Sequence, residues 1–167
     1  MRRGNSIKLR KDNLIVSACD DYRQLSLFFL TALWHNSINP KEDYMTPKEL
    51  VLSGYKSFAE GDMESLGKIY HKDAVMKVNG NHELSGEYRG FDAFLNNFLA
   101  QIPIKFPNFA VNVLNVTAEA DRVHVHLHYT ADNLDTESVH MFVVEDGLQT
   151  EFHIFDDSHK IALALNR

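Results

Sequence analysis

The chain has 167 residues, of which 44% are hydrophobic and 24% are charged, and its formal net charge is −6. This composition is typical of a globular protein and argues against a disordered chain and against a membrane protein. Residues 1–44 hold seven Lys/Arg against five Asp/Glu, and residues 45–167 hold ten against eighteen, so the larger segment is acidic. Binding to a phosphate backbone requires clustered cations, and we therefore expect no nucleic-acid partner.

Residues 1–44 are predicted to be an N-terminal appendage, with a basic opening, a short apolar run and a polar exit. The run, Leu25–Trp34, is shorter than the ~20 residues that cross a bilayer, so we expect no membrane partner. The only cysteine, Cys19, has no intramolecular disulfide partner, which favours a cytoplasmic location. Two interpretations remain open: a genuine extension, disordered or packed as a short helix, or a mis-assigned start whose true initiator is Met45.

Residues 45–167 are predicted to form one domain, which opens with a helix from Pro47 to about Glu60. Thr46 supplies an N-cap hydroxyl, Pro47 suits the first helical position, and Glu49 stands three residues after the cap. Gly61 is a typical C-terminal cap, which predicts that the helix ends there.

A second short helix is expected after Asp62, followed by a strand over Ala74–Asn79 and a polar loop that reaches Gly90. A third helix is predicted from Phe91 to about Gln101, because its apolar residues recur at helical spacing. Pro103 is expected to end it. The remaining chain is predicted as strands over Phe109–Val116, Arg122–Thr130, Ser138–Val144 and Gln149–Asp156.

The last two strands are joined by Glu145-Asp146-Gly147, where Gly147 can adopt the positive φ of a tight hairpin turn. Helices followed by antiparallel strands define an α+β domain in which the helices cover one face of a curved sheet. The sequence therefore predicts an α+β fold of three helices on a curved antiparallel sheet.

Four segments, in this order, resemble the nuclear transport factor 2-like superfamily, which includes ketosteroid isomerase and SnoaL-type polyketide cyclases. They are Phe58–Val75, Ser85–Phe94, Ala120–Tyr129 and Phe142–Asp157. The resemblance covers nearly all of Met45 to Leu165 and implies a cone-shaped, cystatin-like domain with a deep pocket between the helices and the concave sheet. It also implies a small-molecule ligand and a homodimer formed through the sheet.

What the resemblance implies about chemistry differs between branches of the superfamily. The proton-shuttling aspartate of the isomerase branch would fall on Val78, so that base is absent. In the cyclase branch, the strand after the hairpin turn carries an aromatic residue or histidine and, four residues later, an acid/base aspartate. These positions fall on His153 and Asp157, which the resemblance marks as the catalytic candidates.

The alternation of a strand places Glu151, His153, Phe155 and Asp157 on one face of the last strand. A carboxylate desolvated in an apolar pocket, with a histidine nearby, can move a proton without a cofactor. His153 and Asp157 would lie roughly 13 Å apart by strand spacing, so we expect Asp157 to move the proton and His153 to orient the ligand. The alternative is that Asp157 only caps a turn in water.

His124, His126 and His128 share one face of a strand, and a pair of them could bind zinc with His140 as a third ligand. The alternative, which we favour, places them on the outer face of the sheet at a dimer seam, with no metal. Residues expected to line a substrate pocket are aromatic or lie near the proposed site: Tyr55, Phe58, Tyr70, Val78, Tyr88, Phe94, Phe98, His140 and Phe155.

The sequence contains no phosphate-binding glycine loop and no serine or cysteine nucleophile motif, so we expect no cofactor and no covalent catalysis. Two functions stay open at this point. The first is a cofactor-independent acid/base enzyme, an isomerase, cyclase or lyase, acting on a small and largely apolar molecule. The second is a non-catalytic ligand-binding or dimerising module of the same fold, which the loss of the isomerase base at Val78 would favour.

Overall fold

The structure, a computed structural model, describes residues 45–166; the predicted appendage of residues 1–44 lies outside the described residues. The helices and strands, in chain order, are α2 (Pro47–Glu60), α3 (Met63–Lys68), β1 (Tyr70–Val78), β2 (Gly86–Arg89), α4 (Phe91–Asn97), the 3-10 helix η1 (Leu99–Gln101), α5 (Ile102–Lys105), β3 (Ala110–Glu119), β4 (Arg122–Ala131), β5 (Leu134–Glu145), β6 (Leu148–Asp156) and α6 (Ser158–Leu165). No helix in this part of the chain combines the length and the apolar character needed to span a membrane.

Helix α2 has the boundaries that its capping residues predict. The Thr46 hydroxyl accepts a hydrogen bond from the Glu49 backbone N–H at 3.3 Å, and the Glu49 carboxylate accepts one from the Thr46 N–H at 2.8 Å. Gly61 ends the helix with a φ of 72°, a conformation that glycine adopts without strain. The capping box and the terminal glycine are both confirmed.

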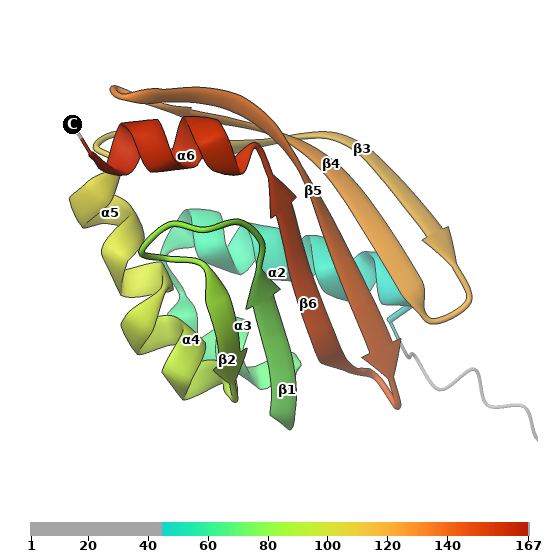
Figure 1. Ribbon diagram of the computed structural model, residues 1–167. Helices are drawn as coiled ribbons and strands as arrows, with labels where there is room; N and C mark the ends of the chain where they lie inside the picture. Colours follow the sequence, from blue (N-terminus) through green and yellow to red (C-terminus); the bar gives the residue numbers. More distant parts are fainter. Residues whose placement is uncertain (1–44, 167) are drawn as a thin grey trace, which may run out of the picture. The chain divides into compact units, whose positions relative to one another are not determined.

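The strands form one curved, six-stranded sheet in the order β2-β1-β6-β5-β4-β3 (Figure 1). All neighbouring pairs are antiparallel except β1 and β6, which run parallel, so the sheet is mixed rather than wholly antiparallel. The β5–β6 hairpin turns at Asp146 and Gly147, which both have positive φ, as predicted for a tight turn. The α+β class and the curved sheet are confirmed.

The predicted end of the third helix is wrong, β1 starts at Tyr70 and not at Ala74, and β5 starts at Leu134 and not at Ser138. Two further elements, β2 and α6, were not predicted. The third helix does not end at Pro103: α4 stops at Asn97, and after η1 the chain begins α5, whose first turn holds Pro103, where a missing N–H does no harm. Strand β2 lies in the predicted loop; it is a largely exposed edge strand with no apolar alternation. Helix α6 follows β6 and is capped by Asp157.

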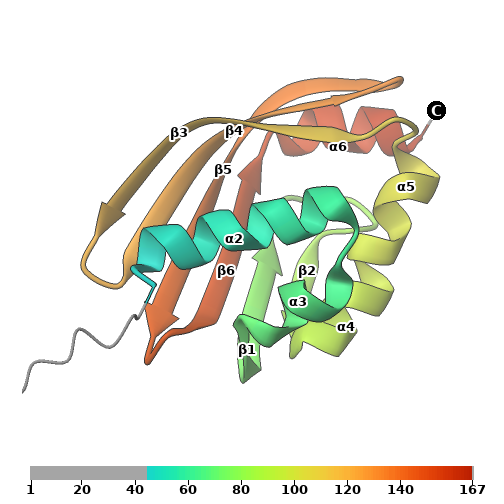
Figure 2. The same ribbon diagram turned by 180° about the vertical axis from the view of Figure 1, so that it is seen from behind.

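The concave face of the sheet carries the core. Alternate residues of β4 point into it, and Val123, Val125 and Leu127 are fully buried there. Helix α2 lies across this face, with α3 and α4 beside it (Figure 2). At one end of the sheet the Asn133 side chain donates hydrogen bonds to the carbonyls of Lys105 and Ala164, and so ties α5 and α6 to the β4–β5 turn. The helices therefore cover the concave face and enclose space above it.

Candidate functional site

A cavity of about 90 Å³ lies between α2, α4 and the concave face of the sheet. Its walls are mainly aromatic and aliphatic, and Phe142 and Phe152 stack in its floor with ring centroids 4.5 Å apart. The polar residues that line it are few: Tyr55, Tyr70, Tyr129, His140, Gln149 and Asp156. Concave apolar sites with a few convergent polar groups are where small ligands bind in proteins.

Three of these residues form a hydrogen-bonded chain through His140, which projects from the middle of β5. The Tyr55 hydroxyl lies 2.6 Å from His140 Nδ1, and the Tyr129 hydroxyl is hydrogen-bonded to Nε2 on the other side of the ring. His140 is only 6% exposed, and its burial lowers its pKa from 6.5 to about 3. The imidazole is therefore neutral throughout the physiological pH range.

The neutral imidazole restricts how protons are arranged in the hydrogen-bonded chain of Tyr55, His140 and Tyr129. It has one N–H donor and one acceptor nitrogen, so one tyrosine must donate to His140 while the other accepts from it. Burial raises the pKa of Tyr55 and of Tyr129 above the ordinary value, so both keep their protons. The tyrosine that accepts from His140 retains a hydroxyl proton for a further partner. The three groups thus present one O–H donor, of the kind that stabilises a developing oxyanion.

Asp156, the last residue of β6, supplies a carboxyl group to the same cavity. The side-chain amide of Asn79 makes two hydrogen bonds with the backbone of Asp156. It donates one to the Asp156 carbonyl and accepts one from the Asp156 N–H, each at 3.2 Å. Its Oδ1 is buried and has no hydrogen-bond partner within residues 45–166. Burial, helped by the adjacent charge of Asp157, raises the pKa of Asp156 from 3.8 to about 6.

A carboxyl group with a pKa near 6 is present in both protonation states close to neutral pH, which suits proton transfer. Tyr129 and Asp156 line the same cavity, and the pKa of Tyr129 is raised by burial and, to a smaller extent, by the charge of Asp156. The cavity therefore combines a candidate base, Asp156, with a candidate hydroxyl donor from the Tyr55–His140–Tyr129 chain.

The structure brings six of the residues predicted for the pocket to the cavity wall: Tyr55, Phe58, Tyr70, Phe94, Phe98 and His140. Three others lie elsewhere. Val78 is packed in the core, and the Tyr88 ring packs behind Phe94 and Phe98 while its hydroxyl donates to the Leu84 carbonyl. Phe155 is 48% exposed on the outer face of the sheet.

The expected positions of Asp157 and His153 are corrected by the structure. Asp157 does not face the cavity: it is exposed, and its carboxylate caps α6 by accepting a hydrogen bond from the Lys160 N–H at 3.1 Å. His153 points to the outer face, where its Nε2 lies 3.2 Å from the Glu151 carboxylate. The predicted grouping of Glu151, His153 and Phe155 on one face is right, but that face is the outer one.

The polar residues that the prediction missed are Tyr129, Gln149 and Asp156. Tyr129 shares its strand face with Val123, Val125 and Leu127, so alternation predicts that it faces the core but assigns no role to its hydroxyl. Asp156 lies on the face shared with Phe152 and Ile154, and this apolar pair is the signal that should have marked it as inward-facing.

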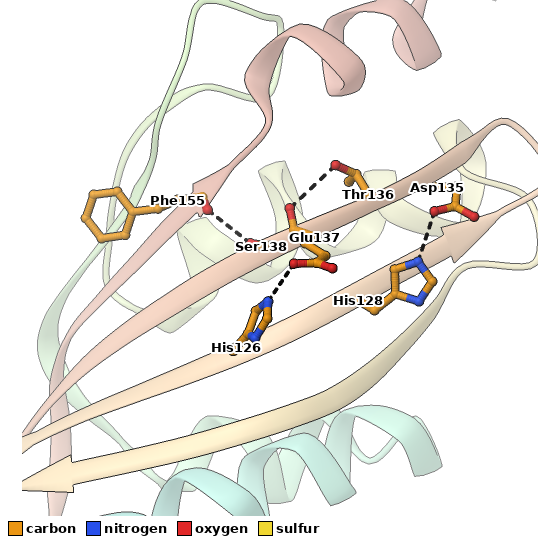
Figure 3. A network of polar contacts seen from close by, with 7 residues as sticks. All are labelled: His126, His128, Asp135, Thr136, Glu137, Ser138 and Phe155. Atoms are coloured by element: carbon orange, nitrogen blue, oxygen red, sulfur yellow. Dashed lines mark hydrogen bonds and ion pairs between the residues drawn. The ribbon is translucent and has the colours of Figure 1, made fainter.

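The histidines of β4 lie on the outer face of the sheet. His126 and His128 bond across to carboxylates of β5, Glu137 at 2.8 Å and Asp135 at 2.9 Å (Figure 3). His140 points to the opposite, concave face, so it cannot complete a metal site with them. Among the described residues no cluster of three potential metal ligands occurs.

The curved sheet, the helices over its concave face and the cavity between them make up the fold of nuclear transport factor 2-like proteins. Residues 51–152 match the model of the SnoaL-like domain. The chain belongs to the SnoaL-like domain family.

Solved structures with the same fold come from several bacteria. A protein of unknown function with a cystatin-like fold from Xanthomonas campestris is 25% identical, with a TM-score of 0.66, over 74% of this chain and all of its own. A nuclear transport factor 2-like protein from Burkholderia thailandensis is 17% identical, with a TM-score of 0.67, over 72% of this chain and 98% of its own.

A candidate SnoaL-like polyketide cyclase from a Jannaschia species is 22% identical, with a TM-score of 0.62, over 77% of this chain and 97% of its own. None of the curated proteins matches the sequence. The likenesses under 25% identity concern the fold alone.

Proposed function

We propose that the protein binds a small, largely apolar molecule in the cavity and catalyses a cofactor-free acid/base reaction on it. The observation that carries this proposal is Asp156, a buried carboxyl group with no hydrogen-bond partner for Oδ1 in the described chain and with a raised pKa, in an otherwise aromatic cavity. Perturbed carboxyl groups in clefts are frequent at functional sites. The fold shared with a candidate polyketide cyclase agrees with this class of reaction.

In the proposed reaction the ligand carries a carbonyl group with a hydrogen on the neighbouring carbon. The Asp156 carboxylate takes this proton, and the electron pair of the broken C–H bond moves to form an enolate. The free hydroxyl of the Tyr55–His140–Tyr129 chain donates a hydrogen bond to the enolate oxygen. If a carbon–carbon double bond is conjugated with the enolate, return of the proton from Asp156 to the far carbon gives an isomer. If the enolate carbon attacks a second carbonyl of the ligand, a ring closes and the alkoxide formed takes the proton from Asp156.

The proposal is tested by following exchange of the α-hydrogens of a small cyclic ketone, 2-indanone, for deuterium by proton NMR. We expect the wild type to accelerate exchange over buffer and Asp156→Asn to reduce this acceleration by about 100-fold or more, the usual contribution of a general base. Asp157→Asn is the matched control and should keep most of the wild-type exchange, because it retains the burial that is the main cause of the raised pKa of Asp156.

Failure of the wild type to exceed buffer would reject enolisation as the activity. Loss of exchange in Asp157→Asn but not in Asp156→Asn would show that the assignment to Asp156 is wrong and that the sequence-based choice of Asp157 is right.

A non-catalytic ligand-binding function is the second candidate. Val78, at the position where the isomerase branch has its base, is buried in the core and does not line the cavity. A protein that only binds its ligand would not need a catalytic base at this position. Tight binding of small apolar probes by the wild type, with no exchange of any ketone, would favour this function.

We also propose that the protein is a cytoplasmic homodimer whose seam is the outer face of the sheet. Val139 and Phe155 are neighbours across β5 and β6, and they are 38% and 48% exposed on this face. A two-fold dimer is the commonest way to cover such a surface. Light scattering should give twice the chain mass for the wild type and the monomer mass for Val139→Glu. A wild-type monomer would reject the dimer.

A further inference from the structure

Gln149 is a buried amide that the proposed reaction does not use. It lies near the start of β6 and pairs with Val144 of β5 on one side and Tyr70 of β1 on the other. Its backbone N–H donates to the Ile69 carbonyl at 2.8 Å. The side chain lines the cavity and is 1% exposed, yet Oε1 has no hydrogen-bond partner among the described residues.

A β-bulge directs this side chain into the cavity. Val143 pairs with Glu151 and Val144 with Gln149, so Thr150 is an extra residue in β6. The extra residue reverses the alternation of side chains, and Gln149 therefore shares the concave face with Phe152. Without the bulge the amide would point outward to solvent.

A glutamine in this environment is unfavourable unless something pairs with it. Leucine has a similar size and would fill the same space without a polar atom. Buried polar side chains in proteins almost always have a hydrogen-bond partner, and an unpaired one requires an explanation. A ligand group seated beside Gln149 provides that explanation, since the cavity is the space that the amide borders.

We propose that Gln149 binds the hydroxyl group of a small planar aromatic ligand. This inference rests on the proposed function for its cavity and names the ligand class. A hydroxyl oxygen can donate to Oε1 and accept from Nε2, so a single group satisfies both ends of the amide. A carbonyl would leave Oε1 unpaired. A carboxylate is disfavoured because no lysine or arginine is among the described lining residues.

The rest of the cavity fits the aromatic part of such a ligand. Phe94 and Phe98 stack at 4.8 Å on the helical side, and Phe142 and Phe152 stack on the side of the sheet. Aromatic walls bind flat rings by stacked and edge-on contacts. Gln149 and Asp156 begin and end the part of β6 that lines the cavity, so a ligand held by Gln149 can extend towards the Asp156 carboxyl.

The test compares two probes of nearly equal size, phenol and toluene, which differ in the hydroxyl group. Calorimetric titration of the full chain should show phenol binding about tenfold tighter than toluene. Gln149→Leu should abolish this preference, bind toluene at least as well as the wild type does, and melt at a higher temperature without ligand, since an unpaired amide has been removed. Gln101→Leu, the same change in η1 outside the cavity lining, should keep the wild-type preference.

An unchanged preference for phenol in Gln149→Leu would overturn the proposal, as would failure of both probes to bind the wild type. A second measurement does not depend on a variant: the Gln149 side-chain amide resonances of the wild type should shift on addition of phenol and not of toluene. Resonances that phenol leaves unmoved would also overturn the proposal. Neither measurement requires turnover, and Asp156→Asn should keep the preference for phenol. Failure of the proposed acid/base reaction is therefore distinguishable from failure of the proposed hydroxyl binding by Gln149.

Discussion

Replacing Asp156 by asparagine should make the protein more stable at neutral and alkaline pH. The carboxyl is largely buried, and its pKa is raised from 3.8 to about 6, mainly by desolvation. At about 1.4 kcal/mol for each pKa unit, this corresponds to about 3 kcal/mol of preference for the neutral form. The group keeps some contact with solvent, and screening reduces the effect on stability to about 1–2 kcal/mol.

The direction of the pH dependence follows from where the proton is bound more tightly. Between about pH 4 and about pH 6 the folded protein holds the Asp156 proton while the unfolded chain releases it, so stability falls as pH rises through this window. Asparagine, which is neutral at all pH values, removes this loss. Asp156→Asn should therefore match the wild type at about pH 4 and exceed it by about 1–2 kcal/mol at about pH 8.

Urea unfolding of both proteins at the two pH values measures this difference, and comparing them cancels the contributions of all other titrating groups. Asp157→Asn is the control, because asparagine also caps helices and α6 should be retained. An Asp156→Asn protein whose stability differs from the wild type by the same amount at both pH values would refute the reasoning.

The other predictions concern His140, the α2 cap and the described domain. His140→Phe should destabilise the protein by about 2 kcal/mol at neutral pH, because two buried hydroxyls lose their partner. The pKa of about 3 also means that the wild type loses stability as pH falls from about 6.5, since only the unfolded chain takes up the proton, and this part of the pH dependence should vanish in urea unfolding of the variant. Thr46→Ala should cost about 1 kcal/mol in the same assay, because the capping box is lost, and an unchanged midpoint would contradict this. A chain that begins at Met45 should unfold in one cooperative thermal transition, and a broad, non-cooperative transition would show that residues 1–44 are needed.

Local signals in the sequence were sufficient for the elements whose boundaries depend on neighbouring residues. Thr46, Pro47 and Glu49 set the start of α2, and Gly61 sets its end, because capping involves only residues a few positions apart. Strand β2 could not be predicted in this way. It is held by pairing with β1, a partner that an exposed, polar four-residue segment does not reveal.

The site was harder to predict because alternation groups side chains by face but does not say which face is concave. Both faces of β6 carry aromatic rings, Phe152 on one and Phe155 on the other. The sequence-based prediction assigned the face that carries His153 to the pocket. For that reason it selected Asp157, and not Asp156, as the candidate carboxyl group. Gln149 was hidden for a different reason, since the bulge at Thr150 that turns it inward leaves no mark in the alternation.

The parallel pairing of β1 with β6 has a consequence for the order in which the molecule assembles. Asn79 bonds to the backbone of Asp156 across 77 positions of sequence, and β1 acquires its second neighbour only when β6, the last strand, is present. Contacts between such distant segments form slowly because a long loop must close first. A chain leaving the ribosome can pair β3, β4 and β5 and still lack one wall of its cavity. Phe94 of α4 would lack its contact with Phe152 of β6 until synthesis is nearly finished, so the last step of folding both completes the sheet and creates the binding site.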